Sequence, residues 1–385
     1  MNSAPTGCPV TDLDPWSESA LADPYPVYRA MRDLGPAVWL RRHAIVALPR
    51  FADVRAALTD WQTFSSAQGA SIDHLRSAEM GESILTSDPP IHANYRKPLT
   101  ELLSVASLAG EVSGIQAVAE EFVDRLVAAQ TFDAVTEMSV PYSVQVVMDL
   151  LGLPDQGRDR IASLGERAFN TMGPGDALHA DGAVALDELA EVTYGGLAGM
   201  CPGRHGERLV NSGHIDGLMA YTWPGIDTTV HSLSSLVLEF ARHPDQWDLV
   251  RADPSLIPGA FNEVLRMHTP VQTFARVTAK PVTIGDVELP AGVRVGVMFG
   301  SANRDERRYD DPDRFDVTRN PLDHLAFGRG IHLCVGMHLA RIEAHSLIAS
   351  LGRRVKRFEL VAEPYWKLNN TLHGLGSLPV RVVPA

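Results

Sequence analysis

A glycine-rich loop around Cys334 constrains this chain more than any other feature of its sequence. Residues 324–336 read HLAFGRGIHLCVG and lead into a helical pattern over residues 337–351. Three glycines within nine residues indicate a tight loop whose backbone approaches another group closely. The N-terminus of the following helix would point its N–H groups at the sulfur and favour the thiolate. The loop therefore predicts either a special structural turn or a ligand site.

Three interpretations of Cys334 are open on this pattern. A lone cysteine in a turn is most often a buried structural residue. Cys334 could instead bind a metal ion together with His332 and His338, although the spacing is unlike that of zinc sites. The third interpretation is a thiolate that ligates haem iron. The chain has three cysteines in all, which is too few for an iron–sulfur ligand set or a disulfide framework.

Composition sets limits on the class of protein. The 385 residues are 45% hydrophobic and 21% charged, and no Pro/Ser/Gly-rich linker divides them, so we expect one helix-rich domain over residues 1–385. A net charge of −13 disfavours broad nucleic-acid binding. No apolar stretch is long enough for a membrane span, and residues 1–14 do not resemble a secretory signal. These features predict a cytoplasmic protein with no membrane contact.

Hydrophobic periodicity predicts the main elements. Residues 37–40 and 45–48 are expected to be short strands, and residues 51–213 are mostly helical in pattern. The stretch 215–242 is expected to form one long helix that ends at His243-Pro244. Strand patterns return at 282–284 and 293–298, with a turn signal at Gly285-Asp286.

The order Phe-Gly-x-Gly-x-His-x-Cys-x-Gly, from Phe327 to Gly336, resembles the haem-binding loop of the cytochrome P450 family. The resemblance extends over nearly the whole chain and implies the family's fold, mainly α with a minor β component. It implies haem b (iron protoporphyrin IX) as cofactor, with Cys334 as the axial ligand of the iron. It also implies that Phe327 packs against the loop, that Gly336 leaves backbone N–H groups free for the sulfur, and that His332 lies near a haem propionate.

Further segments carry the same resemblance. The pair Glu263 and Arg266 lies on one helical face, and the family joins such a pair to a later arginine, which we match to Arg314. This triad is expected to be structural and buried. The resemblance also assigns His92, Arg96 and Arg276 to the haem propionates.

The long helix contains Pro224-Gly-Ile-Asp-Thr-Thr229. In the family, an acid–alcohol pair at this place relays protons to bound dioxygen, and Asp227 and Thr228 occupy those positions. Pro224 departs from the family pattern because a small residue is usual there. Since proline removes a backbone N–H and clashes with the preceding turn, we expect a local opening of the helix between Ala220 and Asp227.

The resemblance implies a monooxygenase that inserts one atom of dioxygen into a small hydrophobic, possibly aromatic substrate, by hydroxylation or oxidative O-demethylation. The loop 65–85 is expected to form one wall of the pocket. The other pocket candidates, taken by position, are Ala220, Trp223, Val271, Thr273, Phe274, Leu372 and His373. His373 is expected to be a solvated turn histidine rather than a substrate contact.

Electrons are expected from separate proteins, a ferredoxin and an NAD(P)H-dependent ferredoxin reductase. Arg329, His338 and Arg341 flank the cysteine loop and are candidates for the docking surface. Two other functions remain open: a peroxide-dependent peroxygenase, which the Asp227–Thr228 pair disfavours, and a non-catalytic haem-binding protein, which only Pro224 favours.

Overall fold

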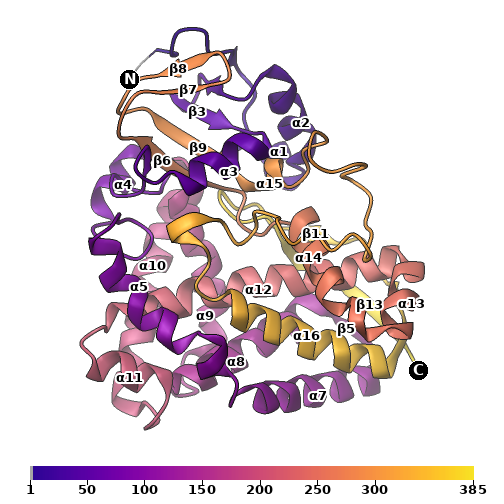
Figure 1. The fold of residues 1–385 in the computed structure, drawn as a ribbon. Coiled ribbons are helices and arrows are strands. Elements are labelled where there is room, and N and C mark those ends of the chain that lie inside the picture. Colours follow the sequence, from indigo (N-terminus) through magenta and orange to yellow (C-terminus); the bar gives the residue numbers. More distant parts are fainter. Residues whose placement is uncertain (1–2) are drawn as a thin grey trace.

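The structure, a computed structural model, describes residues 3–385. Figure 1 shows a smaller part built on a sheet and a larger part built of helices, which the long helix α12 crosses. The helices are α1 (Glu18–Ala22), α2 (Tyr25–Leu34), α3 (Phe51–Thr59), α4 (His74–Glu79), α5 (Ile91–Leu102), α6 (Val105–Leu108), α7 (Val112–Ala129), α8 (Val140–Leu151), α9 (Arg158–Ala168), α10 (Ala177–Gly195), α11 (His205–Asn211), α12 (Asp216–Arg242), α13 (Pro244–Ala252), α14 (Ile257–Met267), α15 (Phe299–Ala302) and α16 (Met337–Arg354).

The strands are β1 (Val10–Thr11), β2 (Val38–Leu40), β3 (Ile45–Leu48), β4 (Phe64–Ser65), β5 (Thr131–Asp133), β6 (Thr273–Thr278), β7 (Val282–Ile284), β8 (Val287–Leu289), β9 (Arg294–Met298), β10 (Val355–Leu360), β11 (Tyr365–Trp366), β12 (Leu375–Ser377) and β13 (Pro379–Pro384). Over residues 3–385 as a whole, more residues lie in helices than in strands, so the expected mainly α fold with a minor β component is confirmed.

The largest sheet joins strands from residues 10–65 with strands from residues 273–298. Its strand order is β1-β2-β3-β9-β6-β4, and β3 pairs in parallel with β9, Val46 opposite Val295. The predicted strands at 37–40 and 45–48 are confirmed as β2 and β3. The turn signal at Gly285-Asp286 is confirmed as well: β7 and β8 form an antiparallel pair, and Gly285 has a φ of 57° that suits glycine.

Helix α12 is the central element of the helical part. It spans Asp216–Arg242, close to the predicted range, and the predicted apolar stripe of Leu233, Leu236, Val237 and Phe240 is buried. The neighbouring helix α13 begins at Pro244, as the His243-Pro244 signal indicated. The expected opening of the helix at Pro224 is wrong, because α12 runs as one uninterrupted α-helix through this residue. Proline has no N–H to donate to the carbonyl of Ala220, yet the helical conformation continues on both sides of it.

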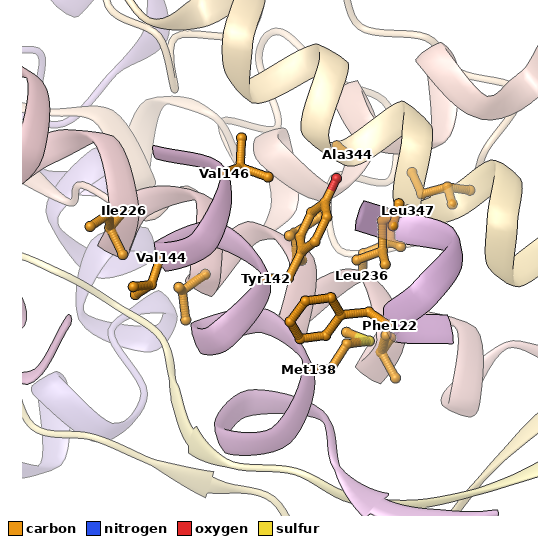
Figure 2. Close-up of a cluster of buried hydrophobic side chains, with 14 of the residues drawn as sticks. Phe122, Met138, Tyr142, Val144, Val146, Ile226, Leu236, Ala344 and Leu347 are labelled. Atoms are coloured by element: carbon orange, nitrogen blue, oxygen red, sulfur yellow. The ribbon is translucent and has the colours of Figure 1, made fainter. Parts of the chain in front are cut away.

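The core beside α12 is formed by helices α7, α8 and α16. Figure 2 shows the Tyr142 ring of α8 between Phe122 of α7 and Leu347 of α16. The rings of Tyr142 and Phe122 meet edge to face, with centroids 5.9 Å apart. The Tyr142 hydroxyl donates a hydrogen bond of 3.0 Å to the carbonyl oxygen of Glu343. These contacts fix α16, and with it the cysteine loop that precedes α16.

Glu343 brings a carboxyl group into this apolar core. Its side chain is fully buried, and within the described residues neither carboxyl oxygen has a hydrogen-bond partner. Burial raises the pKa of Glu343 well above its usual range, and the nearby Ser143 hydroxyl opposes this only in part. The carboxyl group is therefore held in its protonated form over a wider pH range than in the unfolded chain.

Glu343→Gln is expected to change how stability depends on pH. Because the folded-state pKa is raised, the carboxyl group stabilises the wild-type fold fully below the unfolded pKa, roughly 4.3. As pH rises from there towards the folded-state pKa of Glu343, this contribution to stability falls by up to about 1.4 kcal/mol per pH unit. The stability of the variant relative to wild type should therefore increase with pH across that window, as measured by urea unfolding. The control is Glu120→Gln on α7, whose carboxylate is exposed and pairs with Arg353; equal pH dependence in both variants would contradict the prediction.

No single helix within residues 3–385 is long and apolar enough to cross a membrane. Two consecutive segments, Ile91–Leu108 and Val112–Ala129, meet the length and composition criteria only when taken together, and they are bent by 76° relative to each other.

Candidate functional site

The cysteine loop places Cys334 directly before α16. Gly328 and Gly330 have φ angles of 67° and 68°, in the left-handed region that glycine tolerates. A Cβ atom on Gly330 would lie 2.4 Å from the carbonyl oxygen of Leu58, so the loop passes α3 too closely for a side chain. The backbone N–H of Cys334 donates to the carbonyl of Phe327 at 2.8 Å. The tight loop expected from the glycine spacing is confirmed.

The Cys334 side chain faces an internal space. This side chain is accessible to a molecule the size of water, although protein atoms are densely packed around it. Burial raises the pKa of the thiol, whereas the backbone N–H groups of Gly336 and Met337 and the charges of Arg96 and Arg341 lower it. Hydrogen-bond donors and cations thus converge on the sulfur from the start of α16 and from α5. This environment suits a ligand thiolate better than an inert structural cysteine.

A metal site made of Cys334, His332 and His338 is not formed. Within residues 3–385 no group of three or more His, Cys, Asp or Glu side chains is arranged to hold a metal ion. His332 instead lies against His92 of α5, with ring centroids 4.6 Å apart.

Four basic side chains that the sequence assigned to haem propionates gather beside this loop: His92, Arg96, Arg276 and His332. Burial and the charges of Arg276, His92 and Arg96 lower the pKa of His332 to about 3. In the part of the chain that the structure describes, the buried Nε2 atoms of His92 and His332 have no hydrogen-bond partner. Arg276 is buried too, and burial lowers its pKa to about 10.

These unpaired donors fit the cofactor that the sequence implies. Buried cations and unpartnered ring nitrogens favour an anionic group between them, such as the two carboxylates of haem. An open pocket of about 640 Å³ lies at this place and is lined by His92, Arg96, Gly330 and Ile331 among others. The Nη2 of Arg96 also donates to the carbonyl of Leu333 at 2.6 Å, which ties α5 to the cysteine loop.

Part of α12 is accessible in the middle of a buried helix. Pro224 is exposed and Thr228, one turn later, is partly exposed, whereas Tyr221, Ile226 and Val230 are buried. The hydroxyl of Thr228 donates to the carbonyl of Pro224 at 2.9 Å. These two residues therefore share one face of α12, and this face is open.

Asp227 turns away from that face. Its side chain is buried and its Oδ2 lies against α9, where a Cβ atom on Gly165 would come within 2.3 Å of it. Burial and the negative charge of Glu166 raise the pKa of Asp227 well above its usual range, with Lys367 acting in the opposite direction. The acid and the alcohol are adjacent in sequence but point to different surroundings.

The pocket candidates divide into two groups. Ala220, Trp223, Val271 and Phe274 are partly accessible and are therefore available to a ligand. Thr273, Leu372 and His373 are buried and line a cavity of about 10 Å³ near Trp16 and Tyr28. The expectation of a solvated His373 is wrong: its ring stacks on Trp366 with centroids 4.4 Å apart and meets Tyr25 edge to face.

The structural acid–arginine pair lies fully buried in α14. Glu263 and Arg266 form a two-point ion pair with both distances at 2.8 Å. The third member is Arg319, whose Nε lies 3.1 Å from the Glu263 carboxylate. The assignment of Arg314 to this role is wrong, since its side chain is 60% exposed and pairs with Asp311 and Asp316.

The irregular segment after α15 explains why Arg319, and not Arg314, pairs with Glu263. Phe315 is buried and its ring lies 6.1 Å from that of Phe240, centroid to centroid. Because neighbouring side chains of an extended segment point in opposite directions, burying Phe315 directs Arg314 to solvent. The Asp316–Thr318 turn, in which the Asp316 carboxylate accepts from the N–H of Thr318, brings Arg319 back to Glu263.

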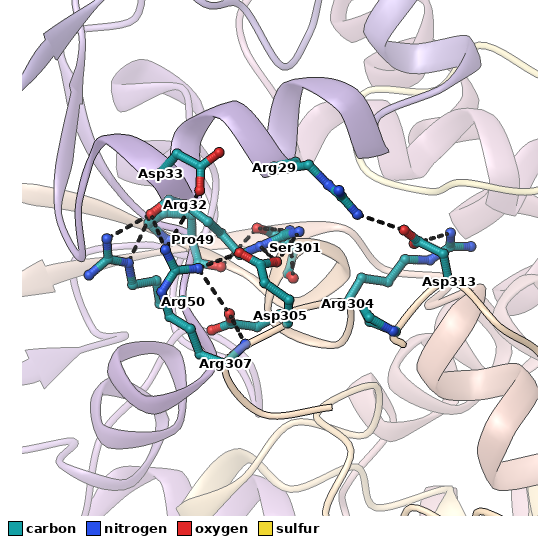
Figure 3. Close-up of polar contacts among 12 residues, drawn as sticks. Arg29, Arg32, Asp33, Pro49, Arg50, Ser301, Arg304, Asp305, Arg307 and Asp313 are labelled. Atoms are coloured by element: carbon teal, nitrogen blue, oxygen red, sulfur yellow. Dashed lines mark hydrogen bonds and ion pairs between the residues drawn. The ribbon is translucent and has the colours of Figure 1, made fainter. Parts of the chain in front are cut away.

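Asn303, to which the sequence analysis gave no role, links this pair to the cysteine loop. Its carbonyl accepts from Arg266 at 3.0 Å, and its side-chain oxygen accepts from the N–H of Leu325 at 2.7 Å. A neighbouring polar network ties the same segment to α2 and to Pro49, the residue after β3 (Figure 3). There Arg32 donates to the carbonyl of Ser301, and Arg304 pairs with Asp313.

The three basic candidates for partner docking are only partly accessible. Arg341 lies over the ring of Phe327, 5.5 Å from its centroid, and burial lowers its pKa. Arg329 and His338 are the better candidates, because no such packing engages them in the described chain.

Known proteins with a similar sequence and fold exist. The sequence profile of the Cytochrome P450 family matches residues 216–381, which include α12, α14 and the cysteine loop. Cytochrome p450 CYP199A2 of Rhodopseudomonas palustris is 35% identical over 98% of this chain and 96% of its own length. Beta-dihydromenaquinone-9 omega-hydroxylase of Mycobacterium tuberculosis is 33% identical over 97% of this chain and 79% of its own. The crystal structure of CalO2 matches with a TM-score of 0.81 at 27% identity, covering 96% of this chain and 98% of that one.

Proposed function

Because this chain belongs to the cytochrome P450 family of haem-thiolate monooxygenases, we propose that it oxidises a small hydrophobic, preferably aromatic substrate by hydroxylation or O-demethylation. The convergence of hydrogen-bond donors and cations on Cys334 is the observation that carries this proposal. Haem b is the cofactor of the family, and when bound it supplies the activation of dioxygen.

The chain's own residues hold the cofactor and its surroundings. Cys334 would hold the haem iron through its thiolate, and the N–H groups at the start of α16 would reduce the charge on its sulfur. His92, Arg96, Arg276 and His332 would hold the propionates, which would pair with the free ring nitrogens of His92 and His332. Phe327 packs beside the loop, held under the guanidinium of Arg341. Glu263, Arg266 and Arg319 keep the segment before the loop in place.

The substrate would contact the open face of α12 and the strand region after α14. The accessible side chains there are Ala220, Val271 and Phe274, and Trp223 is accessible beside them on the α9 side of α12; all four are apolar or aromatic. Trp223 is held in one orientation, because its Nε1–H donates to the carbonyl of Gly165 at 3.1 Å and its ring packs on Phe169. A rigid aromatic side chain favours a flat substrate through stacking.

Electrons come from NAD(P)H through a reductase and a ferredoxin, which dock near Arg329 and His338 in this proposal. Residues 1–385 form one catalytic domain. We place the protein in the cytoplasm, since all three cysteines are unpaired, as a reducing compartment requires.

Thr228→Ala is expected to separate oxygen consumption from product formation. Thr228 is the alcohol on the open face of α12, and a positioned proton donor is typically worth on the order of 10²-fold in rate. With haem, ferredoxin, reductase and a panel of methoxyarenes and terpenoids, the wild type should form product in proportion to NAD(P)H consumed. The variant should still consume NAD(P)H but release hydrogen peroxide.

The matched control is Thr229→Val, since Thr229 is adjacent but buried. Product formed with hydrogen peroxide alone, and none with ferredoxin, would favour a peroxygenase instead. Failure of the wild type to form any product would favour a non-catalytic haem protein.

A further inference from the structure

Pro224 lies in the interior of α12 and has no role in the proposed function. It is exposed, although the helix continues through it. Because a proline has no backbone N–H, the carbonyl oxygen of Ala220, one turn earlier, lacks the donor that the helical pattern normally supplies. Pro224 is the only proline in residues 216–242, so the other carbonyl groups in the interior of α12 keep such a donor.

The carbonyl group of Ala220 lies on the open face of α12. Ala220, Pro224 and Thr228 follow one another at intervals of four residues, so they share one face of the helix. Pro224 is exposed and the other two are partly accessible, whereas Tyr221 and Ile226 are buried. A carbonyl group in an α-helix points along the axis towards the residue four positions later, which here is Pro224. The free acceptor is therefore at the surface that the substrate would contact in the proposed function.

Hydroxyl groups of α12 bond to the next carbonyl groups along the helix, but not to that of Ala220. The hydroxyl of Thr228 donates to the carbonyl of Pro224 at 2.9 Å, and the hydroxyl of Ser232 donates to the carbonyl of Thr228 at 2.7 Å. Each of these bonds joins residues four positions apart, and at position 224 proline has neither a hydroxyl nor an N–H. Within residues 3–385, no side chain and no N–H from outside the helix donates to the carbonyl of Ala220.

The accessible side chains of the proposed pocket offer this acceptor no donor of their own. Val271 and Phe274 are apolar, and the indole N–H of Trp223 already donates to the carbonyl of Gly165 at 3.1 Å. A substrate that covers the Ala220 oxygen without donating to it removes this oxygen from solvent unpaired, which weakens binding. A substrate with a donor at this place avoids that loss. The pocket therefore discriminates between ligands by a hydrogen-bond donor.

We propose that the carbonyl oxygen of Ala220, left free by Pro224, accepts a hydrogen bond from the substrate, and that the substrate is a neutral phenol. A phenolic O–H has a pKa of about 10, so it keeps its hydrogen at neutral pH. A carboxylate would instead bring a second acceptor to the carbonyl oxygen and be repelled by it. The hydrogen bond fixes the orientation of the aromatic ring among apolar side chains. This inference rests on the proposed function, which places the substrate at the open face of α12.

Pro224→Ala tests the site, because alanine restores the N–H that bonds to the carbonyl of Ala220 and also favours the helix. Equilibrium dialysis of the haem-loaded protein, without electron donors, measures the dissociation constants of meta- and para-methoxyphenol. The matched ligands are the corresponding methoxytoluenes, in which a methyl group replaces the hydroxyl. The dissociation constant of the methoxytoluene divided by that of the methoxyphenol measures the preference for the donor. For at least one of the two isomers, this ratio should fall about fivefold from wild type to Pro224→Ala.

Thr228→Val is the matched control on the same face. It removes the nearby hydroxyl but leaves the carbonyl of Ala220 without a donor, so the ratio should stay at the wild-type value. An equal fall in Thr228→Val would show that the hydroxyl of Thr228 binds the phenol, and would overturn the proposal. The loss of the proline ring in Pro224→Ala enlarges the pocket for both ligands of a pair, which are of similar size, so this effect cancels in the ratio.

Binding and turnover separate this inference from the proposed function. If the ratio falls in Pro224→Ala but the wild type forms no product with ferredoxin and reductase, the phenol site stands and the monooxygenase fails. If the wild type oxidises these ligands but the ratio is the same in Pro224→Ala, the phenol site is wrong and the monooxygenase stands. Failure of the wild type to bind either methoxyphenol would overturn the phenol site as well.

Discussion

Cys334→Ala is expected to abolish product formation and to remove the long-wavelength Soret band that a thiolate-bound ferrous haem shows with carbon monoxide. In the proposed site the Cys334 sulfur would bind the haem iron, and alanine supplies no atom that can do so. The propionate-binding side chains are unchanged, so the variant should still take up haem, with altered ligation and weaker affinity. Spectra of the reduced protein with and without carbon monoxide measure this directly.

The fold itself should hardly respond to Cys334→Ala. The Cys334 side chain is accessible rather than packed in the core, so unfolding of the apoprotein in urea should change by no more than roughly 0.5 kcal/mol. Cys201→Ala, at an exposed cysteine, is the control and should leave both the spectrum and the activity intact. A variant of Cys334 that keeps the thiolate spectrum would show that another residue binds the iron.

Arg266→Leu is expected to destabilise the fold by about 3–5 kcal/mol, the largest effect on stability among the changes considered. The guanidinium is fully buried between Glu263 and the carbonyls of Asn303 and Pro312. Removing it leaves the Glu263 charge buried with only Arg319 beside it and leaves two carbonyls without a donor. Urea unfolding of the apoprotein measures the loss. Because Asn303 also holds the N–H of Leu325, haem uptake should fall along with stability.

Two companion variants decide which arginine completes the triad. Arg319→Ala should lower the free energy of unfolding by more than the loss of a surface ion pair would, since its partner Glu263 is fully buried. Arg314→Ala should change the free energy of unfolding by less than about 1 kcal/mol, because the Arg314 side chain that pairs with Asp311 and Asp316 is exposed to solvent. A larger loss of stability in Arg314→Ala than in Arg319→Ala would contradict the placement of these two side chains.

Features that depend on nearby residues were predictable from the sequence. The φ angles of Gly328 and Gly330, the helix that follows Cys334, and the pairing of Glu263 with Arg266 are all set within a few residues. The apolar stripe of α12 was predictable for the same reason, since a period of 3.6 residues is visible in any window of the sequence.

Features that depend on the path of an irregular segment were not predictable. Arg314 and Arg319 are both arginines after an aspartate-rich turn, and only the burial of Phe315 decides which of them reaches Glu263. The sequence predicts a solvated turn histidine at His373, whereas in the fold its ring stacks on Trp366, which lies close only in three dimensions. Pro224 was expected to open its helix, but the packing of α12 in the core keeps the helix continuous.

The sequence by itself determined the family, the ligand cysteine and the local form of the loop that carries it, because these depend on residue identity and short spacing. Only the tertiary structure decided where Asp227 points. Asp227 and Thr228 are neighbours in the chain, yet a helix rotates successive residues by about 100°. Thr228 therefore lies on the open face of α12, and Asp227 lies against Gly165 of α9, near the charges of Glu166 and Lys367. That rotation gives the two halves of the acid–alcohol pair different surroundings, which no reading of Asp227-Thr228 as a motif could show.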